Sequence, residues 1–226
     1  MNKKIAYPLI LVLCIVVAIV VILYAPTKAP SAVHDAPATS DARLPSGAQT
    51  YRIQSAASTA EFQLDETLQG KSKTVIGRTH AVAGVILFNP SDIRSTRFLE
   101  PFTVNARTFQ TDTASRDHAI RRFILRTEND ANEFIVFVPE RLADAPVSLA
   151  VGQTVSFTLA GNLTVSGTTK PVSFLVTLAR PSETKLTGTA KATIFYEDFG
   201  VHVPDFPFLA NVEKSLDLSI VFTAAG

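Results

Sequence analysis

The sequence of 226 residues contains no tryptophan, one methionine and one cysteine, and its charges almost balance. The lone cysteine, Cys14, excludes an intramolecular disulfide, so bridges give no information about the redox compartment. A formal net charge of +1 provides no electrostatic basis for binding nucleic acid. The four histidines lack the spacing typical of metal ligands, and no G-x-S-x-G motif marks a nucleophile. We therefore expect neither a metal site nor catalytic residues.

Apolar residues, by contrast, are plentiful and unevenly placed. Hydrophobic residues make up 46% of the chain, enough to bury a full core within one domain. The 15 phenylalanines begin only at Phe62, so the aromatic mass is confined to the later part of the chain. There it can fill a core or line a cavity.

The N-terminus carries a long uncharged run. Lys3 and Lys4 precede the apolar stretch 5–25, which is close to the ~20 residues that cross a bilayer as a helix. The stretch exceeds the core of a typical cleavable signal, and Pro30 opposes cleavage after it. We predict an uncleaved signal anchor at residues 1–25, single-pass in the inner (cytoplasmic) membrane. The remainder of the chain would then lie in the periplasm or another extracytoplasmic space.

Two further regions follow the predicted anchor. Residues 26–49 are rich in Ala, Pro, Ser, Thr and Asp without periodicity, a composition that predicts a flexible tether. Residues 50–226 predict one all-β domain of about eight or nine strands with mostly short connections. Only 113–125 has helical spacing, and indicates one short helix. The strand pattern alone fits an antiparallel sandwich or a barrel equally well.

One hairpin is especially clear. Apolar and polar residues alternate over 155–165 and again over 172–178, which is the period of a half-buried strand. Gly167 permits the positive φ of a turn between them, and Pro171 suits a strand start or edge. The residues around it read G-N-L-T-V-S-G-T-T-K-P-V over 161–172.

This sequence motif resembles the signature of the YceI-like family. The similarity extends over roughly 51–224 and includes N-A-R-T-F-Q-T-D at 105–112, R-D-H at 116–118, E-D-F-G-V at 197–201 and F-L-A-N-V-E-K at 208–214. The resemblance implies an eight-stranded antiparallel lipocalin-like barrel that binds a polyisoprenoid lipid. It favours the barrel over the sandwich, and it implies that Asp117 holds the short helix to the barrel.

The alternating apolar residues are the candidate ligand-binding positions. An eight-stranded barrel is wide enough either to be filled by side chains or to hold one small ligand. Periodicity alone favours a solid core, whereas the resemblance implies an apolar lumen. Since one bulge reverses the alternation, individual assignments depend on register. The predicted lumen residues are Phe62, Leu64, Val85, Leu87, Val104, Val136, Phe157, Leu159, Phe174, Val176, Ile194 and Leu218.

Charged and aromatic residues supply candidates for the rim of such a lumen. Arg116 and His118 lie in the densest charged cluster, and arginine donates in pairs to phosphate oxygens. The alternative is a set of exposed ion pairs of little energetic value. Phe206 and Phe208 lie in an apolar, proline-broken loop that serves as a portal or simply closes the barrel. We predict that these four residues surround a lipid head group.

The resulting hypothesis is a non-enzymatic protein that binds, transports or sequesters a polyisoprenoid lipid. The ligand expected from the resemblance is an isoprenoid quinone or a prenyl diphosphate, with no other cofactor, and the N-terminal helix would make the membrane a second partner. The sequence leaves room for a homodimer. Two alternatives stay open: an enzyme in which Asp117 and His118 act on a prenyl substrate, and a ligand-free envelope stress or interaction protein with a filled core.

Overall fold

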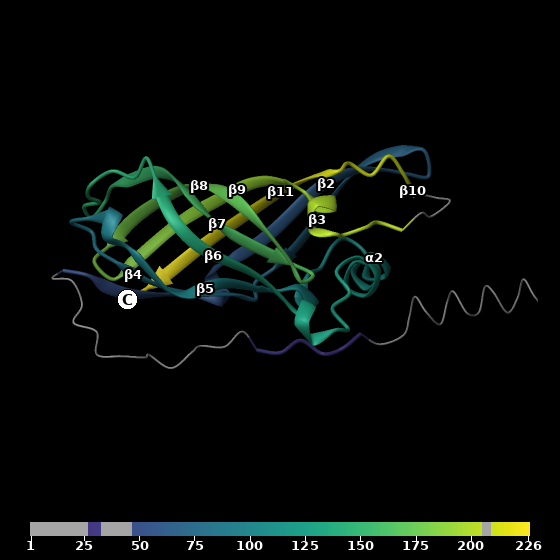
Figure 1. Ribbon diagram of the computed structural model, residues 1–226, viewed down its shortest axis with the longest axis horizontal. Coiled ribbons are helices and arrows are strands. Elements are labelled where there is room, and N and C mark those ends of the chain that lie inside the picture. The colour runs from purple at the N-terminus through teal and green to yellow at the C-terminus, as the bar shows by residue number, and fades with distance from the viewer. Residues whose placement is uncertain (1–26, 33–46, 205–208) are drawn as a thin grey trace, which may run out of the picture.

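The computed structural model describes residues 27–32, 47–204 and 209–226 (Figure 1). Within these ranges no helix is long and apolar enough to span a membrane. The anchor predicted at residues 1–25 lies outside the described residues, as do 33–46 of the predicted tether.

Eleven strands and several short helical turns make up the described domain. The strands are β1 (Gln49–Ile53), β2 (Thr59–Leu68), β3 (Lys71–Thr79), β4 (Val82–Phe88), β5 (Arg97–Asn105), β6 (Phe134–Ala143), β7 (Thr154–Val165), β8 (Thr168–Ser182), β9 (Lys185–Phe195), β10 (Leu209–Ala210) and β11 (Ser215–Ala225). The helical segments are η1 (Ser55–Ala57), η2 (Ile93–Ser95), η3 (Ala106–Thr108), α2 (Ala114–Ala119), η4 (Ile120–Ile124), η5 (Asp130–Asn132) and η6 (Tyr196–Phe199).

Eight of these strands close into a ring. Their order is β1-β4-β5-β6-β7-β8-β9-β11, and every pair is antiparallel. Pairing of Arg52 with Ala225 and of Ile53 with Ala224 closes the ring. The predicted eight-stranded antiparallel barrel with one short helix is therefore confirmed. The β2–β3 hairpin extends this barrel by pairing with β11.

The hairpin between β7 and β8 has the predicted form. Val165 pairs with Thr168, and the two residues between them have positive φ, +48° at Ser166 and +81° at Gly167. Two left-handed residues in a two-residue loop match the twist of the flanking strands. Pro171 lies inside β8, where β8 pairs with β7 but not yet with β9, whose pairing starts at Leu175. An edge position is where a strand tolerates a residue without an N–H.

The antiparallel order gives the barrel two distinct ends. One end, which we call the closed end, carries the β4–β5, β6–β7 and β8–β9 connections. The other, which we call the mouth, carries residues 106–133 with α2, the β2–β3 and β7–β8 turns, and the described residues 196–204 and 209–214. Figure 1 shows α2 beside the barrel at the end where the β2–β3 hairpin projects.

Candidate functional site: an apolar cavity inside the barrel

The interior of the barrel is hollow. A cavity of about 850 Å³ runs within it, and its walls consist almost entirely of Phe, Leu, Ile and Val side chains. This volume is in the upper part of the range of about 300–1,000 Å³ that is usual for small-molecule sites. The filled core that periodicity alone favours is therefore not the interior that this chain forms.

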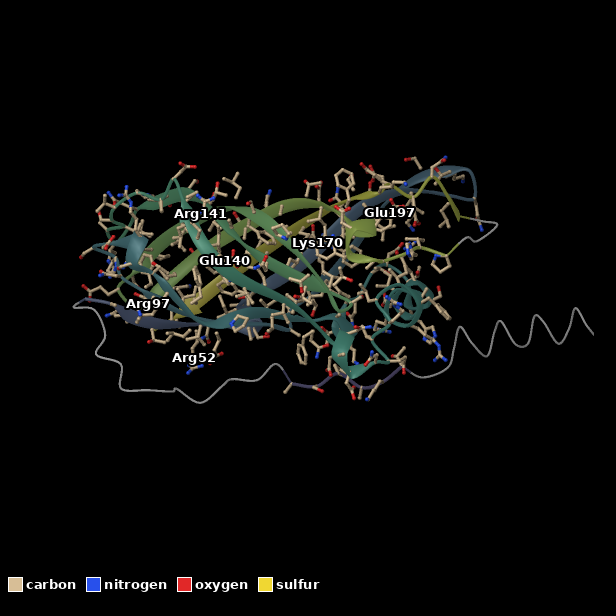
Figure 2. The ribbon with its side chains drawn as sticks, viewed as in Figure 1. Arg52, Arg97, Glu140, Arg141, Lys170 and Glu197 are labelled. Atoms are coloured by element: carbon tan, nitrogen blue, oxygen red, sulfur yellow. The ribbon has the colours of Figure 1, made fainter. Side chains whose placement is uncertain are left out.

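Strand alternation produces the apolar wall. Along β7 the cavity is lined by every second side chain, from Phe157 and Leu159 to Leu163 and Val165. The intervening residues face outward and are polar or small, as at Thr158 and Thr164. Charged side chains such as Glu140, Arg141 and Lys170 cover the outer surface (Figure 2). The alternation of side chains along each strand thus separates an apolar interior from a polar exterior.

Four glycines on the inner wall make room for aromatic rings. A Cβ atom on Gly77 would lie 2.2 Å from the Phe62 ring, and one on Gly84 would lie 2.4 Å from the Phe102 ring. At Gly188 and Gly161 an added Cβ would first meet a backbone oxygen, Thr177 O at 2.4 Å and Val138 O at 2.3 Å. It would also lie 2.8 Å from the Phe222 ring at Gly188 and 2.9 Å from the Phe137 ring at Gly161. The rings lie against the backbone because no side chain stands there. They therefore line the cavity instead of crossing it.

Completely buried side chains seal the closed end of the barrel. Ile93, Leu149 and Leu186 are completely buried, and so is Tyr51, whose hydroxyl donates to the backbone oxygen of Glu183 at 2.5 Å. The loops are joined to one another across this end: the Ile93 N–H donates to Val147 O, and the Leu149 N–H donates to Pro90 O, both at 2.8 Å. A ligand cannot enter where the loops are packed and hydrogen-bonded in this way.

The mouth differs in both exposure and charge. The lining residues Gln69, Thr113 and Ser115 are exposed to solvent here. All charged lining residues come from β2, β3 and α2, namely Glu61, Glu66, Lys73 and Arg116. The cavity therefore opens between the β2–β3 hairpin and α2, with polar groups at its opening and hydrocarbon behind them.

Ion pairs connect the two sides of the mouth. Arg116 Nη2 lies 3.0 Å from Glu66 Oε1, and Arg116 also pairs with Asp112. Lys73 Nζ lies 2.5 Å from Asp112 Oδ2, and this hydrogen bond together with the charge of Arg116 holds the pKa of Asp112 below its ordinary value of 3.8. Two cations and two anions balance here. This cluster of four side chains is thus polar and carries no net charge.

Nine of the twelve predicted lumen residues line the cavity. They are Phe62, Leu64, Val104, Phe157, Leu159, Phe174, Val176, Ile194 and Leu218. The structure places Val85, Leu87 and Val136 elsewhere. In β4 the lining residues are Val82, Ile86 and Phe88, and in β6 they are Ile135, Phe137 and Leu142.

The physical reason for these three placements is strand parity. Val136 faces outward. It lies between its two pairing partners, Thr103 on β5 and Thr164 on β7. Val85 and Leu87 occupy the alternate face of β4 and are nevertheless buried, at 3% and 4% exposure. Because both faces of β4 and β6 are apolar, alternation does not reveal which face is the inner one.

The predicted rim residues are separated by the structure. Arg116 lines the cavity at its mouth. His118 is buried and packs edge-on against the Phe123 ring, with the ring centres 6.3 Å apart, and it is not a lining residue. Phe206 and Phe208 lie outside the described residues. The sequence analysis missed Glu66 and Lys73, which are cross-strand partners on β2 and β3. At this pair the side chains that line the cavity change from apolar to charged.

Asp117 has a structural position. Its Oδ1 atom accepts hydrogen bonds from the N–H and the hydroxyl of Thr111, both at 2.6 Å, and the side chain is buried. These bonds fasten the segment before α2 to the helix. Neither Asp117 nor His118 lines the cavity, so in this structure neither group meets a substrate bound there.

We predict that Asp117→Asn lowers thermal stability and leaves ligand affinity unchanged. Hydrogen bonds to a charged acceptor are worth about 1.5–3 kcal/mol, and the amide weakens both of them. For a chain of this size, 2 kcal/mol corresponds to a fall in Tm of about 4–8 °C. Differential scanning calorimetry measures the fall, with the exposed Asp198→Asn as matched control. Loss of turnover of a prenyl substrate at unchanged Tm would instead support the enzymatic role.

No metal site accompanies the cavity in the described part of the chain. There, no group of three or more His, Cys, Asp or Glu side chains is arranged to hold a metal ion. The cavity offers a hydrocarbon wall, a closed end and a polar opening, an arrangement suited to an elongated amphiphile.

Comparison with solved structures supports the fold. A polyisoprenoid binding domain from Saccharophagus degradans, implicated in plant cell wall breakdown, superposes with a TM-score of 0.56 at 13% identity, over 78% of this chain and 98% of that one. Burkholderia cenocepacia BcnA gives a TM-score of 0.60 at 15% identity, over 76% and 99%. The YCEI protein of Campylobacter jejuni gives 0.50 at 14% identity, over 64% and 81%.

Comparison with protein-family models assigns the chain to a family. A search of the curated proteins found no match. The family model for the YceI-like domain, however, matches residues 51–224, a range that begins within β1 and ends within β11. The chain therefore belongs to the YceI-like domain family.

Proposed function

We propose that this protein binds a polyisoprenoid lipid in its barrel without transforming it, and that it transports or sequesters that lipid. The apolar cavity of about 850 Å³, closed at one end and open at the other, is the observation that carries this proposal. The S. degradans domain that shares the fold is described as polyisoprenoid binding, which supports the same assignment here.

The energetics of such a complex follow from the cavity wall. Burial of each CH₂ group contributes about 0.8 kcal/mol before the cost of association is subtracted. A branched prenyl tail matches a wall of aliphatic and phenylalanine side chains, and it has no polar atom that would remain unpaired inside. Affinity then grows with tail length until the tail reaches the side chains that seal the closed end.

The mouth favours a neutral head group. Glu66 and Asp112 already pair with Arg116 and Lys73, so this lining cluster has no excess positive charge. A diphosphate needs unpaired cations, whereas a quinone needs only a few polar contacts. We infer that an isoprenoid quinone fits this mouth better than a prenyl diphosphate.

We further propose that residues 1–25 anchor the protein in the inner membrane and that the barrel is extracytoplasmic. The apolar, uncharged run that follows two lysines supports this proposal. Anchoring would keep the barrel next to its pool of lipid and so raise the effective concentration of ligand at the mouth.

Native mass spectrometry of the full chain released from detergent tests the binding proposal. The probes are quinones with a short, an intermediate and a long prenyl tail, together with diphosphates carrying the same tails. We expect one bound ligand per chain, affinity that rises with tail length to a plateau, and weaker binding of each matched diphosphate. Affinity independent of tail length would contradict the proposal, and preference for the diphosphates would contradict the assignment of the head group.

A further inference from the structure

The segment 27–32 makes specific contacts with the mouth of the barrel. It is separated from the described part of the domain by a gap at 33–46, yet its backbone and side chains hydrogen-bond to residues 74 to 102 positions away in the chain. Figure 1 shows it in purple, lying beside the residues that lead into β6. These contacts define a site that neither the family nor the proposed lipid binding explains.

Glu133 is the centre of this site. Its Oε1 atom accepts from the Ser31 N–H and from Asn105 Nδ2, the latter at 2.9 Å. Its Oε2 atom accepts from the Ser31 hydroxyl at 3.0 Å and from Arg107 Nη1 at 2.6 Å. The segment thus supplies two of the four donors to a carboxylate that is only 4% exposed. A buried carboxylate requires such partners.

The backbone of the segment is held from both sides. Asn105, which is completely buried, donates through Nδ2 to Ser31 O at 2.7 Å, and Arg107 Nη1 lies 3.3 Å from Ala29 O. Both the N–H and the C=O of Ser31 are therefore paired with the barrel. Pro30 restricts itself and Ala29 to extended conformations, which lowers the entropy lost when the segment binds.

Charge alternates along the site. Lys28 Nζ lies 2.5 Å from Asp130 Oδ1, the same oxygen lies 2.7 Å from Arg107 Nη2, and Arg107 pairs in turn with Glu133. The outer Lys28–Asp130 pair is exposed and adds little energy on its own, whereas the inner Arg107–Glu133 pair is buried. This alternating series of charges selects a peptide that places one cation beside Asp130 and one backbone N–H beside Glu133, at a fixed spacing.

We propose that the chain's own segment 27–32 docks into a peptide-binding site on the barrel, formed by Asn105, Arg107, Asp130 and Glu133. This docking holds the mouth of the cavity next to the point where the chain leaves the membrane. Only Thr27 separates the docked Lys28 from residue 26. The docking itself does not depend on the lipid ligand. Its orienting effect rests on the proposed anchor at residues 1–25.

Chain dimensions show what docking changes. Without it, 22 residues, 27–48, would connect residue 26 to β1. A flexible chain of that length has a root-mean-square span of roughly 26 Å and lets the barrel turn in any direction. With Lys28 held, the first contact with the barrel lies within about 7 Å along the chain from residue 26. Since Asn105 and Glu133 lie at the mouth, the mouth faces the bilayer and the closed end faces away.

The test uses the full chain in nanodiscs with two variants of the segment. Lys28→Glu places a like charge against Glu128 and Asp130, and Ser31→Pro removes the N–H donated to Glu133. Both substituted residues lie in the segment and outside the barrel strands. Lys185→Glu, an exposed residue at the closed end, is the control with the same change of charge.

Two measurements then decide. Hydrogen–deuterium exchange of the peptide 27–32 reports docking: we expect slow exchange in the parent and in Lys185→Glu, and at least tenfold faster exchange in both segment variants. Exchange at the rate of a free peptide in the parent would overturn the docking.

Orientation is measured by collisional quenching from quencher-labelled lipid head groups. In a Cys14→Ser background, a fluorophore sits at Ser72→Cys beside the mouth or at Thr184→Cys at the closed end. We expect strong quenching only at residue 72, and loss of this difference in Lys28→Glu and Ser31→Pro. Equal quenching at the two positions in the parent, or a difference that survives both variants, would overturn the orienting role while leaving lipid binding untouched.

Acid should release the segment. Burial raises the pKa of Glu133, but the bonds from Ser31 and Asn105 and the charge of Arg107 outweigh it, so this pKa lies below 4.5. Hydrogen bonds from Arg107 and Lys28 likewise hold the pKa of Asp130 below 3.8. A lowered carboxyl pKa means that the stabilisation is present above the ordinary pKa and is lost as pH falls through the lowered one. We expect the quenching difference to persist from pH 8 to about 5 and to weaken progressively as the pH falls below the ordinary values of 4.5 and 3.8. A difference that does not decline over this range would contradict this.

Discussion

Ala190→Phe is expected to abolish lipid binding while the barrel stays folded. Ala190 lines the cavity from β9 between Val176 on β8 and Ile220 on β11, both also lining residues. A phenyl ring at this position projects into the space that the ligand would use. Displacing one five-carbon isoprene unit removes up to about 4 kcal/mol of burial, which corresponds to a loss of affinity of about two to three orders of magnitude.

The matched control is Ala160→Phe. Ala160 lies on β7 between Arg141 and Ser173, with its side chain on the face opposite to Leu159. The same ring there leaves the cavity empty. Native mass spectrometry should find the ligand on Ala160→Phe and not on Ala190→Phe, and calorimetry should find the Tm of Ala190→Phe unchanged or raised. Full binding by folded Ala190→Phe would place the ligand outside the barrel.

Glu133→Ala is expected to produce the largest loss of stability. The side chains of Glu133 and Arg107 are 5% and 1% exposed, and their charged atoms lie 2.6 Å apart. Removing one partner of a buried pair costs about 3–5 kcal/mol, because the other charge stays buried without compensation. A loss of that size lowers Tm by about 10 °C in a chain of this length.

Two comparisons separate this effect from a general sensitivity to losing a carboxylate. Glu140→Ala removes an exposed glutamate of β6 and should change stability by less than about 0.5 kcal/mol. The double variant Arg107→Leu with Glu133→Leu removes both charges and should recover part of the loss, since no buried charge is left unpaired. Chemical denaturation measures all three. A Glu133→Ala transition at the midpoint of Glu140→Ala would show that the pair is not effectively buried.

Individual strands could be predicted from local patterns, whereas the choice of a barrel over a sandwich came from the family resemblance. Alternation along 155–165 and 172–178 fixed the β7–β8 hairpin, because each strand there has one apolar and one polar face. The turn at Gly167 and the edge position of Pro171 followed from the same stretch. Where one face of a strand is polar, sequence alone identifies the wall of the cavity, and Phe157, Leu159, Phe174 and Val176 were found in this way.

Other parts of the site depend on information that is not local. In β4 and β6 both faces are apolar, so only pairing with β5 and β7 decides that Ile86 and Phe137 face inward and Val136 outward. The docked segment 27–32 gave no signal either, since its partners Arg107 and Glu133 are charges that meet only in the folded chain.

The central claim is that the barrel encloses an isoprenoid chain, and extraction of the purified full chain with an apolar solvent followed by mass spectrometry tests it most directly. The account predicts an isoprenoid in near-equimolar amount to the protein, retained in Ala160→Phe and missing from Ala190→Phe. Extracts that contain only bulk phospholipid, or the same isoprenoid from both variants, would contradict it.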